Sequence, residues 1–147
     1  MTSSLAVILF VLLVPMLVVA GIYGNGWLYA FLLAKLFQVR VRGPHRISWL
    51  PALATAGVSI VLGLFYLVSE PAGDLALSLA TLVTSPVVVQ KFVPDQSGTA
   101  IGGAPAWLAW IAVLGINLAM VVAFGAIVIA LVLAFGLGLG GFASLVS

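Results

Sequence analysis

Few side chains in this sequence are of the types that do chemistry in proteins. The 147 residues include five Lys and Arg, three Asp and Glu, one His and no Cys. Without cysteine, the chain cannot form disulfides, thiolate metal sites or a cysteine nucleophile. The single histidine, His45, lies in a basic segment, so neither a Ser-His-acid triad nor a two-histidine haem site can be assembled. We therefore predict that the protein is not an enzyme and has no metal-binding residues.

The polar side chains inside apolar stretches are uncharged. Asn117 is the most polar of them, and its amide predicts a hydrogen bond to another helix rather than a contact with a substrate. Ser78, Thr81 and Ser85 share one helix face, but hydroxyls in such segments usually bond to their own helix. The stretch 98–103 contains glycine but matches neither phosphate-binding loop pattern, so we interpret it as a plain loop.

Small residues recur at every fourth position in three segments. This spacing lets two helices approach closely, so it predicts helix-packing faces. The alternative is composition alone, because Gly and Ala are abundant in the chain. The predicted packing positions are Gly26, Ala30, Ala34, Ser59, Gly63, Gly115, Ala119 and Ala123, together with the amide of Asn117.

The composition excludes water as the main solvent of this chain. Apolar residues make up 65% of it and charged residues 5%, whereas soluble domains have about 45–50% and about 25%. The net charge of +2 comes without a basic face of the size that nucleic acid requires, so nucleic acid is excluded as a partner. We predict an integral membrane protein.

Long charge-free stretches predict the architecture. About 20 apolar residues are needed for a helix to cross a bilayer, and continuous rather than alternating apolar runs favour helices over a barrel. We expect a single all-α transmembrane domain over 1–147, a bundle of about four transmembrane helices. The predicted spans are about 5–30, 47–69, 75–92 and 106–135, with a basic loop at 35–46, a Gly-rich loop at 94–105 and a Gly-rich C-terminal tail at 136–147.

Two of these segments leave alternatives open. The stretch 75–92 is short and contains Pro86, so it could be re-entrant, which would leave three spans. The tail 136–147 is expected to be extended, because each glycine weakens a helix by about 1 kcal/mol in water relative to alanine.

The first apolar segment is longer than one crossing requires. Tyr23, Asn25, Trp27 and Tyr29 are typical of an aromatic belt at the membrane surface. If they form this belt, residues 28–37 continue past the hydrocarbon. We expect them to be covered by a partner protein or by lipid headgroups.

The basic residues predict the orientation. Lys35, Arg40, Arg42 and Arg46 lie in the first connection, and with four spans Lys91 falls on the same side. Basic loops stay on the cytoplasmic side, so this side is expected to be cytoplasmic, matrix or stromal, with both termini opposite. The four residues of the first connection are also candidates for docking lipid headgroups or a partner.

The missing chemistry and the small-residue faces favour a non-catalytic accessory or structural subunit of a larger membrane complex, of respiratory, photosynthetic or translocation type. A small oligomeric transporter or channel is the first alternative and a lipid-modifying enzyme the second. A transporter or channel needs polar residues lining its pathway, and a lipid-modifying enzyme needs a paired acid and base or a metal. Expected partners are other membrane subunits and lipids. We expect no cofactor beyond structural lipids, with a bound pigment as the alternative.

Overall fold

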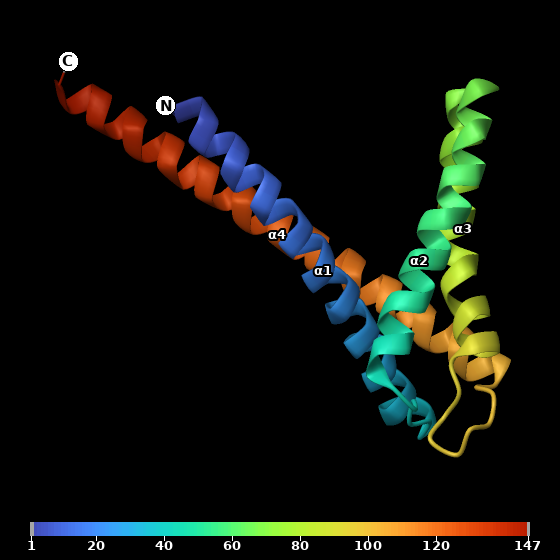
Figure 1. The fold of residues 1–147 in the computed structure, drawn as a ribbon. Coiled ribbons are helices and arrows are strands. Elements are labelled where there is room, and N and C mark those ends of the chain that lie inside the picture. The colour runs from blue at the N-terminus through green and yellow to red at the C-terminus, as the bar shows by residue number, and fades with distance from the viewer. Residues whose placement is uncertain (1, 147) are drawn as a thin grey trace. The chain divides into compact units, whose positions relative to one another are not determined.

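Helices make up nearly the whole chain. The computed structural model describes residues 2–146, without the side chains of Thr2, Ser3, Leu137, Leu139 and Phe142. In this range the elements are α1 (Thr2–Phe37), α2 (Pro44–Leu62), the 3₁₀ helix η1 (Gly63–Leu67), α3 (Glu70–Phe92) and α4 (Gly103–Val146) (Figure 1). Over the described residues, β pairing is limited to two isolated bridges. The prediction of an all-helical chain is confirmed.

Among the described residues, four helical segments are long and apolar enough to cross a membrane. They are Ser4–Phe37, Pro44–Leu67, Glu70–Phe92 and Gly103–Gly136. α3 begins at Glu70, five residues before the predicted start, and its 23 residues run through Pro86 without a break. At 1.5 Å per residue it is roughly 35 Å long, enough for one crossing.

Local sequence explains where the helices begin and end. Ser69 caps α3 because its Oγ accepts a hydrogen bond from the backbone N–H of Ala72 at 3.3 Å. Glu70 lies in the first turn of α3 and Lys91 in the last, where each complements the helix dipole. α1 ends at Phe37 because Gln38 takes a left-handed conformation, with φ at 58°.

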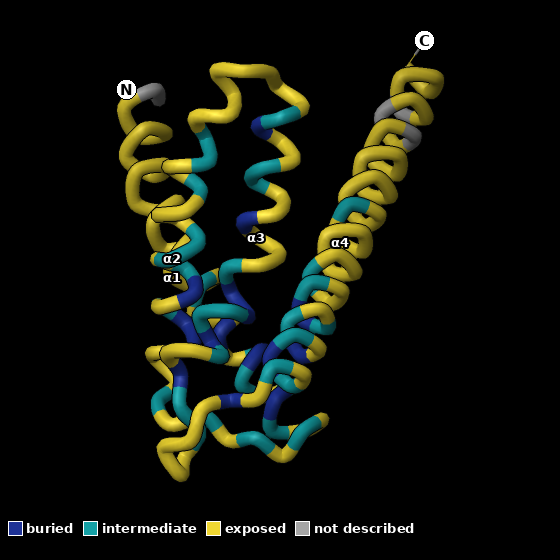
Figure 2. The backbone as a smooth tube through the Cα atoms, turned by 90° about the vertical axis from the view of Figure 1, so that its right-hand side faces the viewer, coloured by how far each residue is buried: buried dark blue, intermediate teal, exposed yellow. Residues whose placement is uncertain are grey.

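The chain divides into two compact units, Met1–Val113 and Leu114–Ser147. The first unit holds the buried core, which lies near the connections between α1 and α2 and between α3 and α4 (Figure 2). Its members are Tyr29, Leu33, Ile47, Val89, Val93, Ile101, Ala106, Ala109 and Val113. Farther from the connections, large apolar side chains such as Phe10 and Met16 of α1 are mostly exposed.

The core corrects the interpretation of the end of the first helix. The sequence predicts Tyr29 in an aromatic belt at the membrane surface, yet its side chain is 2% exposed and Leu33 is fully buried. Both pack with Ala106 and Ala109 from the first turns of α4. The chain itself therefore covers much of the segment for which we expected a partner or headgroups, because the start of α4 supplies small side chains that admit the tyrosine ring.

The second unit is a single helical segment. None of its residues whose burial is described is buried, and Leu114, Asn117 and Gly125 are half-buried. The helix continues through the Gly-rich run to Val146, so the expectation of an extended tail is wrong for residues 136–146. The cost of glycine applies to helices in water, whereas an apolar surrounding forces the backbone to bond internally and so keeps the helix.

Candidate functional site

A cavity of about 330 Å³ lies in the first unit, between α1, α2, α3 and the beginning of α4. Its wall combines small residues with polar ones. Gly21 and Gly26 of α1 and Ala52 of α2 leave the space that larger side chains would fill. The cavity is partly open rather than enclosed.

Burial distinguishes the floor of the cavity from its mouth. Tyr29, Ile47, Ser48 and Ser85 are buried and belong to the floor. Val18, Gly21, Asn25 and Thr81 also line the cavity but are exposed, so they mark its mouth. The mouth therefore lies between α1 and α3.

Several polar groups of the wall already have partners. The Tyr29 hydroxyl donates a hydrogen bond to the backbone oxygen of Ala106 at 2.5 Å. The Ser48 hydroxyl donates to the carbonyl of Pro44 at 3.0 Å, and the Thr81 hydroxyl donates to that of Leu77 at 3.0 Å. These bonds satisfy the three hydroxyls within the protein.

Two polar atoms of residues in the wall lack a hydrogen-bond partner, unlike these three hydroxyls. Thr55 Oγ1 and Trp110 Nε1 are buried and have no hydrogen-bond partner, and both residues line the cavity. The ring of Tyr29 packs edge-on against that of Trp110, with centroids 5.5 Å apart, and this contact holds the indole in place. Buried polar groups normally find a partner, so these two atoms are exceptions to the usual pattern.

The cavity wall is made of uncharged residues. Its lining contains no carboxylate, lysine, arginine or histidine. Across the described residues no cluster of His, Cys, Asp or Glu could hold a metal ion. Comparison of the chain with protein-family models, curated proteins and solved structures finds no match, so its own residues must carry any assignment.

Of the three glycines among the predicted packing residues, only Gly26 would bring a Cβ within 4 Å of another residue. A Cβ on Gly26 would lie 2.6 Å from the Cα of Ser48. Ala30 and Ala34 of the same helix are half-buried, as are Ser59 and Gly63. In the second unit, the predicted packing residues Gly115, Ala119 and Ala123 are exposed, and Asn117 is half-buried.

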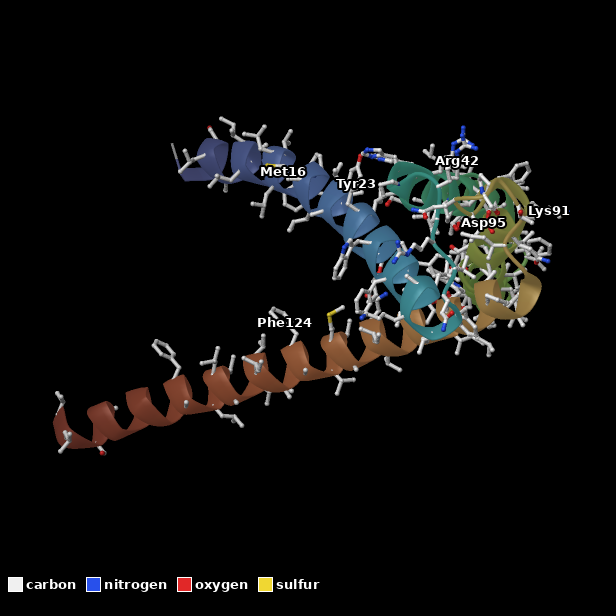
Figure 3. The ribbon with its side chains drawn as sticks, turned by 90° about the horizontal axis from the view of Figure 1, so that it is seen from below. Met16, Tyr23, Arg42, Lys91, Asp95 and Phe124 are labelled. Carbon is white, nitrogen blue, oxygen red and sulfur yellow. The ribbon has the colours of Figure 1, made fainter. Side chains whose placement is uncertain are left out.

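The basic connection pairs with the Gly-rich connection. The N–H of Arg42 donates to the oxygen of Pro94 at 3.0 Å, and the N–H of Gln96 donates to that of Arg40 at 2.8 Å. Figure 3 labels Arg42, Lys91 and Asp95 at this end of the first unit. The structure thus brings both loops, and the basic side chains they carry, to one end of that unit.

The candidate docking residues are accessible. The side chains of Arg40, Arg42 and Arg46 are exposed. The Lys35 ammonium lies 6.0 Å from the centre of the Phe31 ring, which in turn stacks on Trp27. This row of two aromatic rings and a lysine is typical of a helix surface at a membrane interface.

His45 connects two helices. Its Nδ1 lies 3.3 Å from the Tyr23 hydroxyl. The Tyr23 ring also packs edge-on against the rings of His45 and Trp49. The histidine is therefore part of an aromatic contact between α1 and α2.

Sequence reasoning missed Thr55 and Trp110. Ser48, Ala52 and Thr55 occur at i, i+4 and i+7, a small and polar face that the sequence already contains. Nothing in the sequence says that this face meets Thr81 and Ser85, because that depends on how α2 packs against α3.

Proposed function

We propose that the protein is a multi-pass membrane protein and a non-catalytic accessory subunit of a larger membrane complex, of respiratory, photosynthetic or translocation type. The observation that carries this proposal is the segment Leu114–Val146. It has no charged residue, and its described side chains are exposed or half-buried. Such a surface is stable against lipid or against other membrane helices, but not in water.

The small-residue stripe of this segment favours helices over lipid as its neighbours. A Cβ on Gly115 would have nothing within 4 Å, and Ala119 and Ala123 are exposed on the same face. In a membrane, close approach of two helices depends on such small residues. We therefore propose that a helix of another subunit packs on this stripe.

The charge distribution supports the membrane orientation. Stretches 47–69, 75–90 and 96–147 carry no charged residue. Arg40, Arg42 and Arg46 lie in the connection that pairs with the loop after Lys91. By the positive-inside rule this end faces the cytoplasm, matrix or stroma, where it can also contact anionic headgroups.

A photo-crosslinking amino acid at position 119 tests the proposed interface in intact membranes of the native cells. We expect a discrete adduct with one different protein. Val121 lies on another face of the helix, so the same probe at position 121 should give less of that adduct. Adducts with lipid alone at both positions would contradict the proposal, and an adduct with a second copy of this chain would favour the oligomeric transporter or channel.

A further inference from the structure

We propose that the basic end of the first unit binds anionic phospholipids selectively, through their phosphate groups and the first carbons of their acyl chains. The basic end comprises the connections 38–43 and 93–102 with the adjoining helix ends, which carry Lys35, Arg40, Arg42, Arg46 and Lys91. This inference rests on the proposed membrane location and deepens it, because it names one class of lipid and the residues that select it.

The backbone holds the basic side chains of the first connection on a fixed support. The N–H of Arg42 donates to the oxygen of Pro94, and the N–H of Gln96 donates to the oxygen of Arg40. Only backbone atoms take part in these two bonds, and the side chains of Arg40 and Arg42 are exposed. Their guanidinium groups are therefore presented to the surroundings by two paired connections rather than by one single loop.

Helix stability does not explain the position of Arg46. This residue lies in the first turn of α2, where the helix dipole disfavours a cation, and that turn contains no acidic residue. Its side chain is exposed. An anion outside the protein would compensate for this unfavourable placement.

The two ends of the first unit differ in charge. At the basic end, the one carboxylate is that of Asp95, which accepts hydrogen bonds from Ser97 and Thr99. Glu70 and Asp74 lie at the start of α3, a helix roughly 35 Å long. This length is several times the Debye length of about 8 Å at physiological salt. The acidic residues of α3 therefore do not weaken the attraction of anions to the basic end.

An aromatic row leads along α1 to the basic end. The rings of Trp27 and Phe31 stack with their centroids 5.4 Å apart, and the Lys35 ammonium lies 6.0 Å from the centre of the Phe31 ring. All three side chains are exposed, that of Trp27 by 68%. The row covers roughly 12 Å of the helix, whereas the interfacial region of a bilayer is roughly 6 Å thick. It therefore extends from the depth of the phosphates to that of the first acyl carbons.

The combination of charge and aromatic surface favours a lipid over an acidic protein segment. Arginine and lysine bind phosphate oxygens through charge-assisted hydrogen bonds, while acyl chains can cover the exposed rings of Trp27 and Phe31. An acidic protein segment offers only the charge. A zwitterionic phospholipid offers the chains, but the basic side chains repel its choline cation. The surface thus suits an anionic phospholipid.

The test uses the purified full-length chain in vesicles of phosphatidylcholine and phosphatidylglycerol, with brominated acyl chains on one of the two lipids. Bromine quenches tryptophan fluorescence on contact, so quenching at each lipid fraction gives the relative affinity of the two lipids. We expect phosphatidylglycerol to bind about 5-fold more tightly, the effect of about one basic residue near an anionic surface. The difference should shrink in about 1 M salt, where the Debye length falls to about 3 Å.

Single-tryptophan variants locate the lipid preference. A chain that keeps Trp27 and has phenylalanine at the other three tryptophan positions reports on the basic end. In a chain with phenylalanine at all four positions, Val68→Trp reports on the other end, because Val68 is 78% exposed and lies two residues before Glu70. The preference for phosphatidylglycerol should be found at position 27 and be absent at position 68.

Charge variants identify the residues that select the lipid. The triple variant Arg40→Gln, Arg42→Gln, Arg46→Gln should lose most of the preference, whereas lysine at the same three positions keeps the charge and should retain it. The bonds between the connections are made by the backbone, so circular dichroism should show the same helix content. The matched control, Glu70→Gln with Asp74→Asn, should leave the preference unchanged.

The result on the unmodified chain does not depend on how the variants fold. Equal quenching by the two lipids would overturn the inference and would leave an acidic protein segment as the candidate partner of the basic end. A preference that the triple glutamine variant retains would overturn the role of the three arginines. Quenching by neither lipid would contradict the membrane location as well, which separates a failure of the proposed function from a failure of lipid selectivity.

Discussion

Gly26 of α1 packs so closely on Ser48 of α2 that no side chain fits between them. A Cβ on Gly26 would lie 2.6 Å from the Cα of Ser48, nearer than real Cβ atoms approach. Gly24, two residues earlier on the same helix, has nothing within 4 Å of its Cβ position. The two glycines therefore separate the effect of contact from that of helix propensity.

Gly26→Ala is expected to lower the free energy of unfolding by about 1–3 kcal/mol, as overpacking of a tight contact does. Gly24→Ala should be neutral or stabilising by up to about 1 kcal/mol, because alanine favours the helix. Unfolding of the purified protein in mixed detergent micelles measures both. If the two variants have the same stability, close packing of α1 on α2 at Gly26 is not required.

The sequence could predict the helices better than their packing. Charge-free apolar stretches are local signals, and they predicted a helical chain with about four segments of spanning length. The burial of Tyr29 could not be predicted, because it depends on the backbone oxygen of Ala106, 77 residues away. The cavity was missed for the same reason, since its wall comes from four helices. The small-residue pattern did include Gly26, but could not identify Ser48 as its neighbour.

The pairing of the two connections leads to a prediction about topology. Single cysteines at Arg42→Cys and Ser97→Cys should react with a membrane-impermeant maleimide from one side of sealed vesicles. A cysteine at Ala72→Cys, in the first turn of α3, should react from the other side. The motivation is the backbone hydrogen bond between Arg42 and Pro94, together with the basic residues of both connections. Reaction of Ser97→Cys and Ala72→Cys from the same side would contradict four crossings.

The hydrogen bonds of Asp95 lead to a prediction about the response of the Gly-rich loop to acid. Its carboxylate accepts hydrogen bonds from the Ser97 hydroxyl at 2.6 Å and from the backbone N–H groups of Ser97 and Thr99 at 2.9 Å. These bonds, that of the Ser97 side chain foremost, hold the pKa of Asp95 below its ordinary value of 3.8. Because the folded-state pKa is the lower one, the stabilisation is fully present above the unfolded value and is lost as the pH falls through the folded value.

We therefore expect the amides of Ser97 and Thr99 to lose hydrogen-exchange protection in strong acid, after correction for the intrinsic rate. Asp95→Asn cannot titrate, so its loop should respond little to pH over the same range. If the loop of the variant responds to acid as the unmodified loop does, the Asp95 carboxylate is not the responsible group.

The exposed stripe of the second unit predicts an asymmetry between two similar substitutions. Ala119→Leu places a large side chain on the small-residue face and should weaken assembly, because the two helices can no longer approach closely. Val121→Leu changes a large apolar side chain that is 69% exposed and should leave assembly intact. The fraction of each variant in the native assembly, measured on a native gel, distinguishes the two. Equal behaviour would mean that the spacing of Gly115, Ala119 and Ala123 reflects composition alone.

Native mass spectrometry of the protein, extracted from its own membranes in a mild detergent, tests the proposed role most directly. An accessory subunit should appear in a stable particle whose mass requires other polypeptides, present in fixed stoichiometry with this 15.2 kDa chain. Dissociation in a harsher detergent should release it as a monomer. A particle made of this chain alone, whether monomer or oligomer, in the mild detergent would contradict the proposal.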